Sequence, residues 1–136
     1  MARRLAAEGV YRGPGQVCGR LHRISWYPAA VPLAEGEESG DRILGDIFAL
    51  PADEGKLLAA LDAFEDYRPS EPTRGEYRRE IVSVQRAGDA PVNAWIYWYQ
   101  WPVPPSSLIP GGDWRKWYTN PENASLPRAR SPWENS

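Results

Sequence analysis

The chain contains the stretch Leu61-Asp62-Ala63-Phe64-Glu65-Asp66-Tyr67, which is followed by the aromatic and basic segment Tyr77-Arg78-Arg79. The spacing of Leu58, Leu61 and Glu65 at i, i+3 and i+7 predicts that they project from one side of a short helix. An acidic side chain on the core-facing side of a helix loses hydration, so its pKa should rise. Glu65 is therefore a candidate for moving a proton in catalysis. The alternative is that the helix ends just before Glu65 and that this side chain faces water.

Length, charge and cysteine content narrow the class of protein. A chain of 136 residues is long enough for one domain with a hydrophobic core. Its 16 basic and 18 acidic side chains give a net charge of −2, which argues against binding to nucleic acid or to a membrane surface. Cys18 is the single cysteine, which excludes an internal disulfide and indicates a reducing compartment. Because no apolar stretch has the length of a membrane span or of a signal-peptide core, we expect a cytoplasmic protein.

Proline and glycine divide the chain into short segments. Fourteen prolines and twelve glycines favour strands and turns over long helices. The predicted elements are a turn at 13–15, a strand at 16–24 that Trp26-Tyr27-Pro28 ends, an acidic loop at 35–40, a central strand at 43–50, a helix capped by Asp53 with Leu57, Leu58, Leu61 and Phe64 on its apolar side, a strand at 77–85 and a strand at 92–101. We expect residues 1–118 to form a single domain and the polar, Pro-rich residues 119–136 to form a loosely packed tail.

The last predicted strand is rich in aromatic residues. Alternation places Trp95, Tyr97, Tyr99 and Trp101 on one face, and Ile96 and Trp98 on the other. Packing inside a sheet is the favoured explanation, because aromatic side chains suit pleated surfaces. The second explanation is a surface on which sugars, bases or a proline-rich peptide stack.

Most other catalytic chemistry lacks the residues that it needs. His22 is the single histidine, and no serine motif of the nucleophile-elbow type accompanies it. One histidine and one cysteine do not make a transition-metal site, and the carboxylates Asp62, Glu65 and Asp66 are typical of a solvated helix face. The chain also lacks a phosphate-binding glycine loop. We therefore expect no metal and no cofactor, and the acids and tyrosines remain as candidate functional groups.

Six short motifs occur in an order that resembles the γ-glutamylcyclotransferase-like superfamily, which includes the plant avirulence-induced-gene proteins and the γ-glutamylamine cyclotransferases. In this chain they are Gly19-Arg20-Leu21 with Tyr27-Pro28, Leu44-Gly45-Asp46-Ile47-Phe48, Leu61-Asp62-Ala63-Phe64-Glu65, Tyr77-x-Arg79 with Val82 and Val84, Ala94-Trp95-Ile96-Tyr97, and Ile109-Pro110-Gly111-Gly112-Asp113-Trp114. Each motif is weak alone, but six in the family's order are specific.

The resemblance implies an α+β fold, namely a small, mixed but mainly antiparallel β-barrel with one or two short flanking helices. It implies that a γ-glutamyl amide or peptide is cyclised to 5-oxoproline with release of an amine, with Glu65 as the catalytic acid and base. Tyr77 and Tyr97 would shape the substrate pocket. Arg79 would pair with Glu65 or with a substrate carboxylate, or else form a salt bridge that anchors the helix to the strand. Asp62 is expected to be structural. The implied partner is a small γ-glutamyl molecule, and the oligomeric state is not predicted.

One family feature is missing from the start of the sequence. Members of the superfamily begin with a strand that ends in Tyr-Gly-Thr-Leu or a similar loop, whose amides hold the γ-glutamyl end of the substrate. This sequence begins at Met1-Ala2-Arg3, apparently downstream of that segment, and Tyr11-Arg12-Gly13-Pro14-Gly15 does not replace it. Either the true start lies upstream or the loop has been lost. Two alternatives to an enzyme therefore stay open: a non-catalytic binding or scaffold module on the same barrel, and an unrelated ligand-binding barrel in which Glu65 is structural.

Overall fold

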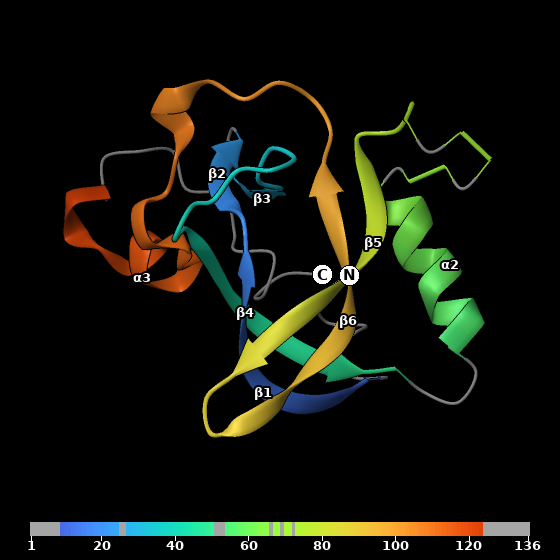
Figure 1. Cartoon of the computed structure of the whole chain (residues 1–136). Coiled ribbons are helices and arrows are strands. Elements are labelled where there is room, and N and C mark those ends of the chain that lie inside the picture. The colour runs from blue at the N-terminus through green and yellow to red at the C-terminus, as the bar shows by residue number, and fades with distance from the viewer. Residues whose placement is uncertain are drawn as a thin grey trace.

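The computed structural model describes residues 9–24, 27–50, 54–65, 67–68, 70–71 and 73–123 (Figure 1). The described elements are β1 (Val10–Cys18), β2 (Arg20–Ile24), β3 (Tyr27–Val31), β4 (Arg42–Ala49), α2 (Glu54–Phe64), β5 (Tyr77–Arg86), β6 (Asp89–Tyr99), α3 (Trp114–Thr119) and the short 3-10 turns η1 (Pro105–Ser107), η2 (Pro110–Gly112) and η3 (Pro121–Asn123). Among the described elements, four strands precede α2, two follow it and α3 comes after them, so strands and helices do not alternate as they would in an α/β protein.

Antiparallel pairing dominates the strands. A four-stranded sheet has the order β4-β1-β5-β6, and β2 pairs with β3 in a separate hairpin. β3 lies against β6, an edge strand of the larger sheet, so the hairpin packs at that edge (Figure 1). The short helices α2 and α3 flank these strands. The predicted fold class, a small and mainly antiparallel α+β fold with one or two short helices, is confirmed.

The first half of the chain corrects three of the predicted elements. The turn expected at 13–15 lies inside β1, where the register shifts between Tyr11 and Gly13. The strand expected at 16–24 is divided at Gly19 between β1 and β2, and Tyr27-Pro28 begins β3 instead of ending a strand. The strand expected to be central, β4, lies at the edge of the sheet. β4 also contacts β2 and η2, and Ile43 is buried, whereas Leu44 is 40% exposed.

Two apolar clusters hold the strands together. The larger cluster contains Val17, Leu21, Ile43, Val84, Trp98, Ile109 and Trp114. The smaller cluster joins Ala29 of β3 to Tyr77 and Tyr99, which face each other across β5 and β6 with ring centroids 5.4 Å apart. Because the smaller cluster lies on the other face of the β5–β6 pair, both faces of this pair are partly covered.

The motif Ile109-Pro110-Gly111-Gly112-Asp113-Trp114 closes the fold. The backbone N–H of Ile109 donates to the Leu21 carbonyl at 2.8 Å, and the Asp113 carboxylate accepts from the Lys116 N–H at the start of α3. Gly112 has a φ of +65°, and a Cβ atom on it would lie 1.9 Å from the Arg42 carbonyl oxygen. A glycine is therefore required where this turn crosses β4.

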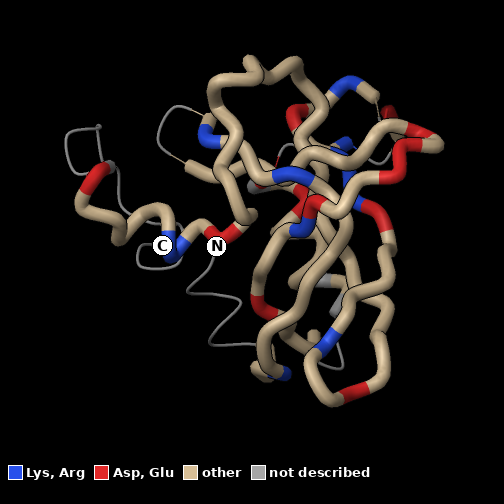
Figure 2. Tube along the Cα trace, turned by 60° about the vertical axis from the view of Figure 1, so that its left-hand side comes forward, with Lys and Arg blue, Asp and Glu red and all other residues tan. Residues whose placement is uncertain are grey.

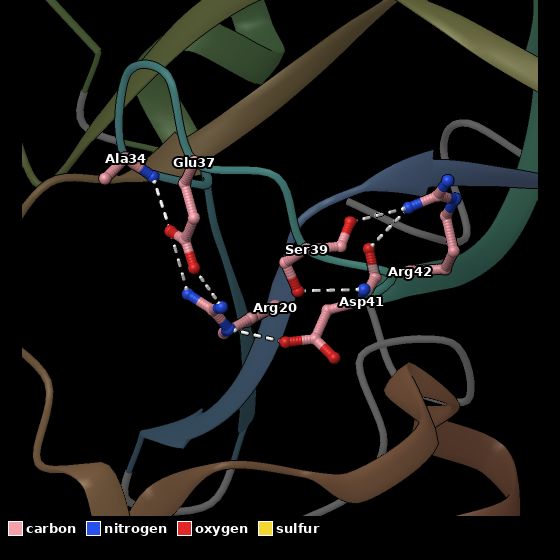
Figure 3. Close-up of polar contacts among 6 residues, drawn as sticks. All are labelled: Arg20, Ala34, Glu37, Ser39, Asp41 and Arg42. Carbon is pink, nitrogen blue, oxygen red and sulfur yellow. Dashed lines mark hydrogen bonds and ion pairs between the residues drawn. The ribbon is translucent and has the colours of Figure 1, made fainter.

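The acidic loop predicted at 35–40 is a loop, and Arg20 holds it against β2 (Figure 3). The Arg20 guanidinium binds both carboxylate oxygens of Glu37, and its Nε lies 2.6 Å from Asp41 Oδ2. The Glu37 carboxylate also accepts from the Ala34 N–H at 2.9 Å. These charged side chains therefore stabilise the conformation of the loop.

In the view of Figure 2, Lys and Arg residues are interspersed with Asp and Glu residues along the described part of the chain. None of the described helices is long and apolar enough to cross a membrane. Thr119 ends α3, Pro121–Asn123 form η3, and the rest of the predicted tail, 124–136, lies outside the described residues. The division of the chain into a domain at 1–118 and a tail at 119–136 stays a prediction.

Candidate functional site

The last turn of α2 places Glu65. Leu57 is fully buried, Leu58 and Leu61 are half-buried, and the Glu65 N–H continues the helix by donating to the Leu61 carbonyl at 2.9 Å. The Tyr67 N–H then donates to the Asp62 carbonyl at 2.9 Å, a bond across the helix end that is typical of a C-terminal cap. Glu65 is consequently half-buried at the end of the helix rather than extended into water. The predicted cap Asp53 lies outside the described residues.

Burial changes the protonation of Glu65. Desolvation raises the pKa of its carboxyl group from 4.5 to about 7, and the nearby carboxylate of Glu76 adds to the rise. A carboxyl group with a pKa near neutrality exists in both protonation states at physiological pH. It can therefore accept a proton in one step and return it in another.

Tyrosines on three strands lie near enough to this carboxyl group for its charge to affect them. Burial is the main cause of the raised pKa of Tyr27 on β3, Tyr77 on β5 and Tyr97 on β6, and the charge of Glu65 adds to the rise for each. All three phenols therefore remain protonated hydrogen-bond donors at neutral pH. The structure thus brings the predicted site residues Glu65, Tyr77 and Tyr97 to one place.

Arg79 and Asp62 form a second, more buried group beside Glu65. Arg79 Nε lies 2.9 Å from Asp62 Oδ1, and the two side chains are 15% and 10% exposed. Arg79 Nη2 also donates to Asp62 Oδ2 at 3.2 Å, and the Tyr97 hydroxyl donates to Asp62 Oδ1 at 2.5 Å. Of the roles considered for Arg79, the structure therefore displays the salt bridge from helix to strand, and Asp62 is its partner.

Arg79 is also enclosed by aromatic rings. Its guanidinium carbon lies 4.2 Å from the centre of the Trp95 ring and 5.5 Å from that of Tyr67. Both distances are within the range of a cation–π interaction. Trp95 is 44% exposed, so one side of this stack is open to solvent.

Sequence reasoning missed two residues at the site, Glu76 and Tyr27. The Tyr27 hydroxyl donates to Glu76 Oε1 at 2.8 Å, although 49 positions separate them in the chain. Tyr27 belongs to the Tyr27-Pro28 motif, which was predicted to end a strand, and Glu76 directly precedes Tyr77. The position next to a predicted site residue was the only signal for Glu76.

The described residues offer no metal-binding cluster of three or more histidine, cysteine, aspartate or glutamate side chains. A solvent-open hollow of about 280 Å³ lies away from Glu65, between β1, β4 and the turn that joins β5 to β6. Leu44, Gln85 and Arg86 are among the residues that line it, and none of the predicted site residues does.

Comparisons with known proteins assign the chain to a family. The family model for gamma-glutamyl cyclotransferase, AIG2-like proteins, matches residues 1–116. The gamma-glutamylcyclotransferase family protein YtfP of Escherichia coli K12 is 31% identical over 96 residues, which cover 70% of this chain and 66% of that protein. The Shigella flexneri protein of the same name gives the same values, and the Citrobacter rodentium protein is 30% identical over the same shares. The matched segment thus spans just under two thirds of these relatives, and no solved structure gives a significant match. The chain belongs to the gamma-glutamyl cyclotransferase, AIG2-like family.

Proposed function

We propose that this protein is a cytoplasmic enzyme that cyclises the γ-glutamyl end of a small amide or peptide and releases 5-oxoproline and a free amine. The observation that carries the proposal is the half-buried carboxyl group of Glu65, whose pKa is raised to about 7 among three tyrosines. Family membership and the names of the relatives support the reaction class. The single cysteine Cys18, which is free and exposed, agrees with a reducing compartment.

The reaction needs one nucleophile and one electrophile from the same substrate. The α-amine attacks the γ-carbonyl carbon, so a carbon–nitrogen bond forms within the glutamyl group while the carbon–nitrogen bond to the leaving amine breaks. The attacking ammonium loses a proton, and the leaving nitrogen gains one. Holding the substrate in a bent conformation contributes by orientation, because both reacting groups then lie within bonding distance.

Glu65 carries both proton transfers in this proposal. Its ionised form takes the proton from the α-ammonium, and its protonated form gives that proton to the leaving nitrogen. General acid–base catalysis of this type contributes roughly 10²–10⁴-fold to the rate. Because the pKa of Glu65 is about 7, neither form is strongly disfavoured in the cell.

Tyr77 and Tyr97 line the substrate side of Glu65 in the proposal. The single hydroxyl proton of Tyr97 goes to Asp62, so Tyr77 is the phenol proposed to donate to the substrate. Arg79 has a positioning role in the proposal. It binds the Asp62 carboxylate, which also accepts the hydrogen bond from the Tyr97 hydroxyl. The pair would hold the Tyr97 ring at a fixed distance from the end of α2. The reaction also requires backbone N–H donors for the substrate oxyanion.

The proposal is tested by incubating the purified protein with a panel of γ-glutamyl dipeptides and γ-glutamylamines and measuring 5-oxoproline. Glu65→Gln keeps the shape of the side chain but cannot relay a proton, so we expect turnover to fall about 10²–10⁴-fold. The matched control is Glu80→Gln, because Glu80 is an exposed residue of β5 that pairs with Arg78. Turnover that survives in Glu65→Gln would exclude the role given to Glu65.

One observation favours the second candidate, a non-catalytic binding module on the same fold. Asp62 already occupies polar groups of Arg79 and Tyr97, two of the four predicted site residues. A folded protein that forms no 5-oxoproline from any substrate of the panel would support this candidate. The exposed Trp95 beside Arg79 would then be the first place to look for a contact surface.

A further inference from the structure

One face of the β5–β6 pair continues past the candidate site and becomes open to solvent. Side chains alternate along both strands, so the pair Arg79 and Tyr97 is followed on this face by the pair Ile81 and Trp95. Ile81 is 59% exposed and Trp95 is 44% exposed. Asp62 of α2 binds Arg79 and Tyr97, whereas the turn that joins β5 to β6 lies away from this helix (Figure 1). Two large apolar side chains are therefore uncovered next to the candidate site.

Ile81 and Trp95 form a small apolar surface, which we call the shelf. They lie directly opposite each other across β5 and β6, where the side chains of an antiparallel pair are close enough to touch. The guanidinium carbon of Arg79 lies over the Trp95 ring, 4.2 Å from its centre. This contact fixes the orientation of the ring on the sheet. A ring that is already fixed loses little conformational entropy when it binds a ligand.

A short series of contacts connects the shelf to Glu65. Trp95 stacks on Arg79, and Arg79 Nε lies 2.9 Å from Asp62 Oδ1. The Tyr97 hydroxyl, next to Trp95 on the same face, donates to this Asp62 oxygen at 2.5 Å. Helical hydrogen bonding continues from Leu61 to the Glu65 N–H, so Asp62 and Glu65, three residues apart, project from the same side of the helix. The shelf and Glu65 therefore adjoin the same Asp62 carboxylate.

The shelf does not offer a free positive charge. Arg79 is the charged residue that contacts it, and the Asp62 carboxylate neutralises this guanidinium through contacts of 2.9 and 3.2 Å. The next pair of residues along this face is Ser83 and Asn93, which are polar but uncharged. A carboxylate placed on the shelf would lose hydration without gaining an ion pair. An apolar group would instead gain from leaving water.

We propose that Ile81 and Trp95 hold the leaving group of the γ-glutamyl substrate, and that this group is an apolar amine without a carboxylate. The inference rests on the proposed function, since it assigns a place to the amine that the reaction releases. The glutamyl part of the substrate lies at Glu65, and the alkyl or aryl part of the amine lies on the shelf. Ile81 and Trp95 thus select the substrate and take no part in proton transfer.

The kinetic test compares three substrates that differ only in the leaving group: γ-glutamylphenethylamine, γ-glutamylphenylalanine and γ-glutamylmethylamine. Formation of 5-oxoproline gives kcat/KM for each. Contact with the shelf should favour the phenethylamine substrate over the methylamine substrate by about tenfold. The phenylalanine substrate adds one carboxylate to the phenethylamine substrate, and we expect its kcat/KM to be about tenfold lower.

Substitutions in the shelf should remove this preference. Ile81→Ser and Trp95→Ala should each lower the ratio of kcat/KM between the phenethylamine and methylamine substrates to about threefold or less. The ratio cancels any loss of activity that both substrates share. Val10→Ser is the matched control, because Val10 is an apolar β1 residue with 55% exposure, and we expect it to keep the original ratio. Ile81→Leu keeps the apolar surface and should also keep the ratio.

Binding is measured separately from turnover with glutaric acid monophenethylamide, which lacks the α-amine that attacks the γ-carbonyl. The indole N–H signal of Trp95 in ¹⁵N-labelled protein, assigned with Trp95→Phe, should shift saturably with this compound and much less with glutaric acid monomethylamide. An unshifted Trp95 signal, equal kcat/KM for the three substrates, or a preference for the phenylalanine substrate would overturn the inference and leave the proposed function standing. A saturable shift in a protein that turns over none of the three substrates would reject the proposed function and keep the shelf as a binding site for apolar amides.

Discussion

The two faces of the β5–β6 pair perform different tasks with residues that alternate along the same strands. On one face, Val84 and Trp98 belong to the larger apolar cluster. On the other face, Arg79 and Tyr97 lie opposite each other and reach the carboxylate of Asp62 on α2. The first, apolar face packs into the larger cluster. The second, polar face carries the smaller cluster at Tyr77 and Tyr99 and also the residues that bind the helix end next to Glu65. In this pair of strands, the larger apolar cluster and the candidate-site residues therefore lie on opposite faces.

Asp62 and Glu65 show the same division within one turn of α2. The Asp62 carboxylate is matched by a guanidinium and a phenol. Glu65 instead meets burial and a second carboxylate, which together raise its pKa. Charge pairing makes an acid a structural anchor, and desolvation beside a like charge makes it a proton carrier.

The largest loss in the free energy of unfolding should come from a substitution on the apolar face. Trp98 is 3% exposed, and Trp98→Ala should lower the free energy of unfolding by about 3–5 kcal/mol, because it leaves a cavity in the larger cluster. The matched variant on the polar face is Trp95→Ala, which removes a ring that is 44% exposed and its stacking on Arg79, for a loss of about 1 kcal/mol. Urea denaturation measures both. Equal losses would show that the two faces do not differ in the way described here.

Breaking the buried ion pair between Asp62 and Arg79 should give the next largest loss in the free energy of unfolding. Asp62→Asn keeps the shape of the side chain but leaves Arg79 without a counter-charge, so we expect a loss of about 3 kcal/mol. Asp89→Asn, at the exposed start of β6, should change the stability by less than about 0.5 kcal/mol. Adding Arg79→Met to Asp62→Asn should recover part of the loss, since the uncompensated charge is then gone. Failure to recover any stability would mean that packing, and not charge, accounts for the effect of Asp62→Asn.

Glu65 should make stability depend on pH in the opposite sense from a paired acid. Its pKa is about 7 in the folded protein and 4.5 when exposed, so between these values the folded state binds more protons than the unfolded state. Stability should fall as the pH rises from 4.5 to 7, by on the order of 2 kcal/mol. Glu65→Gln should therefore be more stable than the unsubstituted protein at pH 8 and nearly equal to it at pH 4.5. Urea denaturation of both proteins at the two pH values isolates the contribution of Glu65. An equal difference at both pH values would contradict the raised pKa.

The sequence was sufficient for elements whose signals are local. Alternation and flanking turns placed the strand at 77–85 within one residue of β5, and leucine spacing placed α2. The sequence was insufficient where distant segments meet. Gly15 was assigned to a turn, but it lies in β1, where a Cβ atom would stand 2.4 Å from Val84 Cγ1. The same reason explains why Glu65 could be proposed from its helix, whereas the contact between Tyr27 and Glu76 could not: no local pattern encodes a contact across 49 positions.

The smallest expected loss of stability comes from Tyr97→Phe. This variant tests whether the Tyr97 hydroxyl has a structural role or binds the substrate. Tyr97→Phe keeps the ring and removes the donor to Asp62, so we expect a loss of about 1–2 kcal/mol in the free energy of unfolding. Tyr11→Phe is the control, because the exposed Tyr11 hydroxyl makes a comparable bond of 3.1 Å to Asp46 on the surface. If the hydroxyl serves Asp62 alone, kcat and KM of Tyr97→Phe should stay within about threefold of their original values. A large rise in KM with unchanged stability would instead place the Tyr97 hydroxyl on the substrate, and Asp62 would then hold only Arg79 on the polar face.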